Sequence, residues 1–259
     1  MLGFNGGTIG IANTVFTGTK SNDPNYSNVS LLLNGNETSG SDPNYSSVSL
    51  LLNGNGTNGS TTFTDSSSYG HTVTPVGNAQ ISTTQSKFGG ASMYFDGSGD
   101  YLTLAEDSSL DLGTGDFTFE LWVYILSQTD DMMVGSSSAY ANVQLFRINT
   151  GGTYEYLTVY LNSGSVIQIQ NSGVTVNSWH HLALARSGST VRVFVDGTLA
   201  ASATNSGAVA VDKIGAFYYQ GNLFGSFYVN GYIDDLRITK GVARYTSNFN
   251  PPTEPFPND

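Results

Sequence analysis

The sequence predicts an all-β protein, an antiparallel β-sandwich with an extended N-terminal arm. Gly, Ser, Thr and Asn interrupt nearly every window in which apolar residues three and four apart would indicate a helix. Residues 117–126, FTFELWVYIL, alternate instead, with Phe, Leu, Val and Ile on one face and Thr, Glu, Trp and Tyr on the other. Asn-Gly, Asp-Gly and Gly-rich turns separate about a dozen short apolar runs, which is typical of a sandwich.

The predicted strands follow one another with short turns between them. Residues 179–203 predict a meander: a strand, a Ser-Gly-Ser-Thr turn, the strand VRVFV, an Asp-Gly turn and a further short strand. The other strands are expected at VSLLL (48–52), ASMYFDG (91–97), YLTL (101–104), VQLFRI (143–148), YLTVYL (156–161), VIQIQ (166–170), DKIGAF (212–217) and GYIDDLRIT (231–239).

A tandem duplication precedes most of these strands. Residues 23–41 repeat as residues 42–60, and the copies differ only at Asn28/Ser47, Glu37/Gly56 and Ser39/Asn58. A closed sandwich has one place for the strand VSLLL, so we expect the second copy to fill it.

The first copy has two interpretations. It is either a linker left by the duplication, or an attachment strand whose Val29, Leu31 and Leu33 complete the sheet of a neighbouring subunit or lie along a scaffold. We therefore divide the chain into an N-terminal attachment and oligomerisation arm, residues 1–43, and a sandwich, residues 44–259.

Composition excludes several classes of protein. The chain has 9 Lys and Arg against 20 Asp and Glu, so we expect no nucleic-acid partner, because phosphate contacts need clustered positive charge. No run approaches the roughly 18 apolar residues of a membrane-spanning helix, so no membrane insertion is expected. The absence of cysteine excludes disulfides, thiolate metal sites and cysteine nucleophiles.

Four segments together resemble a known family. Residues 87–104, 117–124, 179–197 and 231–257 resemble the laminin-G-like branch of the concanavalin A-like lectin/glucanase fold, and the resemblance covers residues 44–257. It implies a jelly roll of two antiparallel sheets used mostly for binding glycans or proteins. The closing stretch GYIDDLRITKGVARYTSNFNPPTEPFP is its most specific part and resembles that of phage and bacterial surface proteins.

The carboxylates do not match the pattern of a glycoside hydrolase. Such enzymes need two carboxylates about 5 to 10 Å apart, and the strand at 117–125 offers Glu120 alone. We expect Glu120→Gln to change stability little. The adjacent pairs Asp130-Asp131 and Asp234-Asp235 point to opposite faces of an extended strand. We interpret Asp234 as an ion-pair partner of Arg237 or Arg244 in the closing strand.

The three histidines do not indicate a catalytic or metal site either. His180 and His181 are consecutive in a predicted strand, so one faces inward and the other outward, and similar proteins carry Trp-His-His there as a structural feature. His71 could serve as the base of a catalytic triad, but the sequence has no Gly-x-Ser-x-Gly motif that would supply a serine nucleophile. We therefore predict a protein without enzymatic activity.

Calcium is the one cofactor for which the sequence offers candidate ligands. Asp96 and Asp100 lie four residues apart in FDGSGDY, and Ca²⁺ prefers carboxylate and carbonyl oxygens. Other laminin-G-like domains often bind calcium at a sandwich rim. The alternative is a structural Asp-Gly turn in which Asp96 accepts hydrogen bonds from its own backbone.

Aromatic side chains in polar loops are the candidates for sugar binding, because tyrosine gives a large contact area at low entropic cost. Residues 216–234, AFYYQGNLFGSFYVNGYID, are the richest source. The candidate sugar-binding residues are Tyr140, Tyr154, Tyr218, Tyr219 and Tyr228.

We thus predict a structural protein of a phage virion, such as a capsid decoration, fibre or tail appendage protein, that displays a lectin-like domain. Its expected partners are other virion proteins, copies of itself in a homo-oligomer and host surface polysaccharide, and its expected location is a particle assembled in the bacterial cytoplasm. The first alternative is a carbohydrate-binding adhesin on a bacterial cell surface. The second is a glycoside hydrolase, which the missing carboxylate pair disfavours.

Overall fold

The computed structural model describes residues 41–127, 130–135, 144–149, 156–161, 165–219 and 222–259. These residues form an antiparallel β-sandwich, which confirms the predicted fold class, and residues 42–259 make one compact unit. Residues 23–40 of the first repeat copy, with Val29, Leu31 and Leu33, lie outside the described residues, so the role of this copy stays a prediction. Across the described part of the chain, no helix is long and apolar enough to span a membrane.

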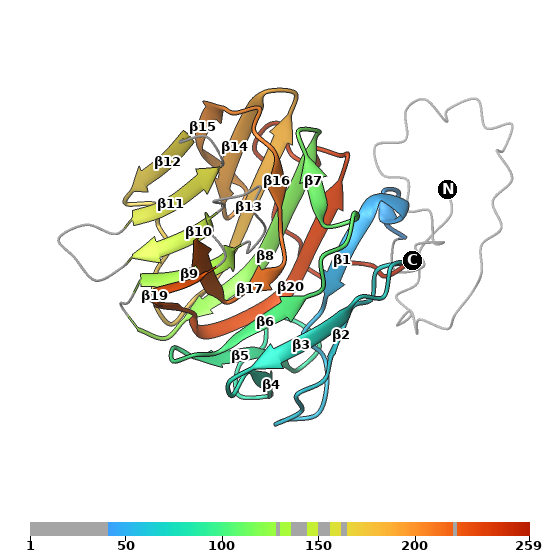
Figure 1. Ribbon diagram of the computed structural model, residues 1–259, viewed down its shortest axis with the longest axis vertical. Helices are drawn as coiled ribbons and strands as arrows, with labels where there is room; N and C mark the ends of the chain where they lie inside the picture. The colour runs from blue at the N-terminus through green and yellow to red at the C-terminus, as the bar shows by residue number, and fades with distance from the viewer. Residues whose placement is uncertain (1–40, 128–129, 136–143, 150–155, 162–164, 220–221) are drawn as a thin grey trace, which may run out of the picture. The chain divides into compact units, whose positions relative to one another are not determined.

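Within the described residues, twenty strands follow a short 3-10 turn at Tyr45–Ser47, and Figure 1 shows their arrangement. They are β1 (Val48–Leu52), β2 (Phe63–Thr64), β3 (Thr72–Val76), β4 (Gln80–Ser82), β5 (Ser92–Asp96), β6 (Tyr101–Leu104), β7 (Asp111–Gly113), β8 (Phe117–Ile125), β9 (Asp130–Gly135), β10 (Gln144–Asn149), β11 (Tyr156–Leu161), β12 (Ser165–Gln170), β13 (Trp179–Ser187), β14 (Thr190–Val195), β15 (Thr198–Thr204), β16 (Val209–Ala210), β17 (Lys213–Ile214), β18 (Ala216–Tyr219), β19 (Asn222–Tyr228) and β20 (Asn230–Lys240).

Two large sheets form the layers of the sandwich. The first sheet has the order β15-β14-β13-β8-β20-β5-β4, and β1 also pairs with β20. The second sheet has the order β12-β11-β10-β9-β17-β6-β3-β2. Two short ribbons, β7 with β16 and β18 with β19, complete the described strands.

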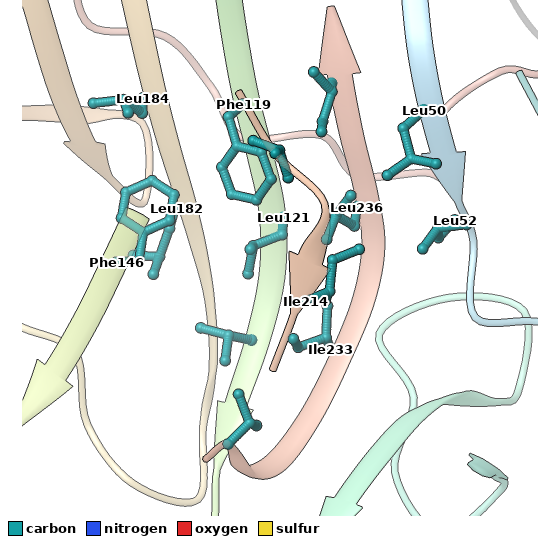
Figure 2. Packing of buried hydrophobic residues seen from close by; sticks show 14 of the residues in the cluster. Leu50, Leu52, Phe119, Leu121, Phe146, Leu182, Leu184, Ile214, Ile233 and Leu236 are labelled. Atoms are coloured by element: carbon teal, nitrogen blue, oxygen red, sulfur yellow. The ribbon is translucent and has the colours of Figure 1, made fainter. Parts of the chain in front are cut away.

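The core lies between the two sheets and follows the alternation of the sequence. Phe119 and Leu121 of β8 and Leu182 of β13 point into it from the first sheet, and Phe146 and Ile214 belong to the second (Figure 2). All five are fully buried. The predicted inward face of residues 117–125 is therefore confirmed. The other face of the first sheet, which carries the alternate residues, is called the outer face below.

The second repeat copy supplies β1, as expected. β20 is long enough to pair with two strands on one edge: its beginning pairs with β5, and its later part pairs with β1 (Figure 1). Leu50 lies opposite Ile238 and Leu52 opposite Leu236, and both leucines are buried in the core.

The closing segment, residues 241–259, covers part of the outer face. The rings of Tyr245 and Phe249 stack with their centroids 3.6 Å apart, and both pack against Phe194 of β14. Further on, Phe256 packs against Leu51 of β1. The segment therefore fastens β1 and β14 to the same sheet from outside, over positions that alternate with the core residues.

Candidate functional site

The uncovered aromatic side chains of the outer face form a row across four neighbouring strands. Tyr94 of β5 lies opposite Tyr232 of β20, which lies opposite Tyr124 of β8, which lies opposite Trp179 of β13. Their ring centroids are 5.0, 5.9 and 5.5 Å apart in that order. Tyr94, Tyr124 and Trp179 are half-buried and thus reach solvent, while Tyr232 between them is 5% exposed. We call these four residues the aromatic row.

A polar hollow adjoins the row at Tyr94. It has a volume of about 390 Å³, and it is lined by Thr61, Gly77, Asn78, Gln80, Tyr94 and Asp96. Gln80 lies opposite Tyr94 on β4, so it continues the line of the row into the hollow. Burial, followed by the neighbouring Tyr232 and Asp96, raises the pKa of the Tyr94 hydroxyl, which therefore stays protonated as a hydrogen-bond donor at neutral pH. Ring faces and polar groups thus meet at one place.

The other half of the outer face is charged and buried. Nη2 of Arg237 lies 2.8 Å from Oε1 of Glu120, and its Nη1 lies 3.0 Å from Oδ2 of Asp42. Arg244 reaches the same Asp42 oxygen at 2.6 Å. The Tyr245 hydroxyl donates to Oε2 of Glu120 at 2.7 Å. These five residues, with His181, are called the charge network; it ties β8 and β20 to the closing segment and to the residues before β1.

The charge network overturns the expected tolerance of Glu120. Its side chain lies on the outward face, as the alternation predicts, but it is fully buried under the closing segment. Burial alone would raise the pKa of Glu120, yet the Arg237 guanidinium, then His181 and the Tyr245 hydroxyl, lower it to about 2. Glu120 is therefore a structural anion and is unsuited to give or take a proton near neutral pH.

Asp234 and Asp235 have partners other than the predicted arginines. Oδ2 of Asp234 accepts hydrogen bonds from the backbone N–H groups of Lys87 and Phe88, and Arg237 pairs with other carboxylates. Asp235 accepts from the Asn53 amide and from another backbone N–H. Burial raises the pKa of Asp234 to about 7 and that of Asp235 to about 6. The interpretation of Asp234 as an ion-pair partner was wrong, because its carboxylate accepts backbone N–H groups while Arg237 and Arg244 pair with Asp42, and Arg237 also with Glu120.

Of the two candidate calcium ligands, Asp100 does not fit a metal site. It is fully buried, and its two oxygens accept the backbone N–H groups of Asn78 and Asp96. Asp96 instead faces the hollow, where it accepts from the Ser98 N–H at 2.8 Å. Among the residues that the structure describes, no three His, Asp or Glu side chains gather as a metal site would require. A calcium ligand at Asp96 stays a prediction.

The structure does contain a Ser-His-Asp chain of hydrogen bonds, although the sequence has no Gly-x-Ser-x-Gly motif to indicate it. Nδ1 of His71 lies 2.7 Å from Oδ2 of Asp65, and its Nε2 lies 2.8 Å from Oγ of Ser109. However, Ser109 is 4% exposed, and its hydroxyl donates to Oδ1 of Asp107 at 2.6 Å. Since that hydrogen points away from His71, the arrangement holds two loops together rather than activating a nucleophile.

The two consecutive histidines also have structural partners. Nδ1 of His180 lies 2.8 Å from Oδ2 of Asp196, and its Nε2 accepts the N–H of Thr175. Nε2 of His181 lies 3.3 Å from Oε2 of Glu120 inside the charge network. His180 thus holds the turn at Asp196, and His181 lies within ion-pair distance of the buried Glu120 carboxylate.

The predicted sugar-binding tyrosines are not the ones that the fold gathers into the aromatic row. Tyr140 and Tyr154 lie outside the described residues. Tyr218 and Tyr219 belong to β18, of which the backbone pairing with β19 is described. Tyr228 is half-buried at the end of β19, where burial and the neighbouring Tyr101 raise its pKa.

The aromatic row escaped prediction because its members come from four separate segments. All four lie in strands that the sequence predicted, but the order of strands in the sheet was not known. An aromatic residue on the polar face of FTFELWVYIL was the signal available.

Comparison with protein families identifies the fold at the level of sequence. The family model for the concanavalin A-like lectin/glucanases superfamily matches residues 96–244, more than half of the chain. The chain belongs to this superfamily. The match runs from Asp96 at the hollow to Arg244 in the charge network, so it includes Tyr124, Trp179 and Tyr232 of the aromatic row. Comparison with curated protein sequences gives no match.

Several solved structures share the superfamily fold at low sequence identity. The binding domain of Paraclostridial Mosquitocidal Protein 1 aligns with 80% of this chain and 50% of its own, at 15% identity and a TM-score of 0.53. Domain 4 of AbnA, a GH43 extracellular arabinanase from Geobacillus stearothermophilus in complex with arabinotriose, covers 76% of this chain and 93% of its own, at 18% identity and a TM-score of 0.51.

Botulinum neurotoxin type C, whose cell entry depends on interaction with two ganglioside molecules, is also similar. Its structure aligns with 77% of this chain and 49% of its own, at 13% identity and a TM-score of 0.53. This chain therefore spans about half the length of the two toxin structures. At these identities the likeness shows a common sandwich, on which the superfamily places both lectins and glucanases.

Proposed function

We propose that this domain is a non-catalytic glycan-binding module and that the aromatic row with the adjoining hollow is its sugar site. The observation that carries the proposal is the row itself, Tyr94, Tyr232, Tyr124 and Trp179, on the outer face of the first sheet. Aromatic faces offer apolar contact to the C–H faces of sugar rings, and a few well-placed polar groups fix the ligand's orientation.

The dimensions of the row fit an extended oligosaccharide. Its four residues stand on four adjacent strands, and three gaps of about 4.8 Å between strands give a length of roughly 14 Å. Asn78, Gln80 and Asp96 at one end supply amide and carboxylate groups that hydrogen-bond sugar hydroxyls. Stacking along the row and hydrogen bonding in the hollow would therefore act on the same chain of sugars.

The carboxylates around the site favour binding over hydrolysis. Glycoside cleavage needs an acid and a second carboxylate on opposite sides of the scissile bond. Glu120 is held in the charge network, and Asp100 is fully buried with a backbone N–H donating to each of its oxygens. Asp96 is the carboxylate that lines the hollow. The site as described thus has the contacts of a lectin and lacks the pair that would make it a glucanase.

The solved structures support this proposal by their ligands. The arabinanase domain was solved with arabinotriose, and the type C neurotoxin interacts with gangliosides. Both ligands are glycans or carry them, on a sandwich that this chain shares.

The biological setting that we propose is a phage particle. Support comes from the closing stretch, residues 231–257, which resembles that of phage and bacterial surface proteins, and from the repeated segment before the sandwich. In this setting the arm, with Val29, Leu31 and Leu33, attaches the domain to other virion proteins or to copies of itself. The sandwich would then face outward toward host surface polysaccharide.

A glycan array followed by two substitutions tests the sugar site. We expect binding to one class of oligosaccharide, and we expect Tyr124→Ala and Trp179→Ala each to lower the affinity at least tenfold with an unchanged circular dichroism spectrum. Tyr69→Ala is the matched control, because Tyr69 is 53% exposed and lies outside the row. A silent array, or row variants that bind as the wild type does, would overturn the proposal in favour of a structural role.

A further inference from the structure

The contacts of the second repeat copy show what a strand needs in order to occupy the position of β1. β1 is held in place on both faces: Leu50 and Leu52 are buried in the core, while Val48 and Leu51 pack against Phe256 of the closing segment. We call this position, beside Leu236–Thr239 of β20, the β1 slot.

Polar anchors hold the start of the second copy. Asp42 pairs with Arg237 at 3.0 Å and with Arg244 at 2.6 Å. Burial alone would raise the pKa of Asp42, but the hydrogen bonds from Arg244 and the Asn44 N–H, with the charges of Arg244 and Arg237, together lower it. The N–H of Asp42 donates to the carbonyl of Asp259 at 3.0 Å, so this residue also joins the two ends of the sandwich.

Further anchors lie on each side of β1. The Tyr45 hydroxyl donates to the Ser66 carbonyl at 2.6 Å, and the Asn53 amide donates to Oδ1 of Asp235 at 2.7 Å. Gly54 follows with φ +69°, a conformation that favours glycine. The slot thus selects a specific sequence and does not accept just any apolar strand.

The first copy carries every one of these anchors. The counterparts of the eight anchoring residues, nineteen positions earlier and identical in type, are Asp23, Tyr26, Val29, Leu31, Leu32, Leu33, Asn34 and Gly35. Gly40 and Ser41 also match Gly59 and Ser60, whose backbone groups pair with Ile81.

We propose that the first copy, residues 23–41, is a second occupant of the β1 slot of its own chain. In this alternative register the chain slides by one repeat, and residues 42–60 leave the sheet as a loop between residue 41 and Thr61. Whichever copy is outside the slot is the one free to attach the domain.

The substituted positions determine which register is favoured. Gly56 has φ +155°, and a glutamate, the residue of the first copy, would be strained there. Oδ1 of Asn58 accepts the N–H of Thr83 at 3.0 Å, a contact that the shorter Ser39 would lose. The second copy is therefore the major occupant and the first copy the minor one.

Sliding within one chain is simpler than exchange between chains. Each chain has one β1 slot and two copies of the strand. Exchange of strands between chains therefore fills no additional slot, and it costs association entropy. The slide instead lengthens one loop by nineteen residues at an exposed position, Thr61, and loop entropy grows slowly with length.

Paired leucine substitutions in the full-length chain test the proposal. Leu50→Asp with Leu52→Asp disables the second copy, Leu31→Asp with Leu33→Asp disables the first, and a third variant carries all four changes. We expect the first-copy variant to melt as the wild type does, the second-copy variant to melt cooperatively a few degrees lower, and the four-site variant to be unfolded. If the second-copy variant is as unstable as the four-site variant, or if the four-site variant melts like the wild type, the proposal fails.

Disulfide trapping gives a readout that does not depend on variant stability. The chain has no cysteine, and Val48 lies opposite Thr239, so Val48→Cys with Thr239→Cys is the positive control. We expect Val29→Cys with Thr239→Cys, with both leucine pairs intact, to accumulate a disulfide within monomers under oxidising conditions, and faster once Leu50 and Leu52 are replaced. A link found between chains, or no link at all, would overturn the intrachain slide.

Discussion

Replacing Glu120 by glutamine should destabilise the sandwich strongly and in a pH-dependent way. Glu120 is fully buried and receives hydrogen bonds from Arg237 and Tyr245. Its pKa of about 2, against 4.5 for an ordinary glutamate, corresponds to roughly 3 kcal/mol at about 1.4 kcal/mol per pH unit. Removing one partner of a buried ion pair costs about 3–5 kcal/mol in general, and glutamine keeps one acceptor, so the lower end applies.

The pH dependence follows from the direction of that shift. The folded state holds Glu120 ionised, so its contribution is fully present above about pH 4.5, where the unfolded chain is ionised as well. It is lost as the pH falls from 4.5 toward 2, because the unfolded chain then binds the proton first. We therefore expect the difference between wild type and Glu120→Gln to shrink over that interval.

Urea unfolding from pH 7 down to the lowest pH at which the wild type folds measures both effects. Glu106→Gln is the matched control, because Glu106 is exposed and should change the free energy of unfolding by no more than about 0.5 kcal/mol. If Glu120→Gln stayed within that same margin at pH 7, or kept a constant deficit down to pH 2, the reasoning from the charge network would be refuted.

Three further predictions concern the core, the buried Asp100 and calcium. Phe119→Ala should leave a cavity between the sheets and lower the free energy of unfolding by about 3–5 kcal/mol in a urea titration, and a loss below about 1 kcal/mol would contradict the packing described. Asp100→Asn should lower the melting temperature, because an amide nitrogen would replace one of the two acceptors of backbone N–H groups. If Asp96 ligates calcium, a chelator should lower the wild-type melting temperature and added calcium should restore it; an unchanged melt would leave Asp96 in the structural Asp-Gly turn alone.

The strands could be predicted from the sequence, but the packing of the closing segment over their outer face could not. The alternation in FTFELWVYIL is local and indicates which residues of β8 enter the core. Whether the opposite face meets water depends on residues far along the chain. Tyr245 reaches Glu120 from 125 positions away, and Asp42 reaches Arg244 from 202 positions away. No local pattern encodes these contacts, which is why Glu120 was expected to tolerate substitution.

The aromatic row was unpredictable for a related reason. Tyr94 and Trp179 are 85 positions apart in the chain, and they belong to one row because β20 inserts between β5 and β8. The sequence shows that each strand carries an aromatic residue on its polar face, but the sideways order of strands decides whether these residues meet. The repeated strand VSLLL was predictable because a closed sheet leaves one place for it, whichever strand is its neighbour.

The outer face of the first sheet has a charged half under the closing segment and an aromatic half that is uncovered. Along β8 the outward residues run from Thr118 and Glu120 under the closing segment to Trp122, 5% exposed, and then to half-buried Tyr124. A sheet whose outer face were aromatic throughout would expose a large apolar patch, and such patches promote unspecific association. Here the closing segment covers the part that carries ions, where the network compensates their desolvation, and leaves uncovered the part whose ring faces can hold a ligand. A carboxylate placed at Tyr124 would lie beside the exposed rings but would lack Arg237, whereas Glu120 pairs with Arg237 and is fully buried under the closing segment. The order of the outward residues along β8 therefore separates the buried charges from the exposed rings on one face, an arrangement that supports the proposed glycan binding over hydrolysis.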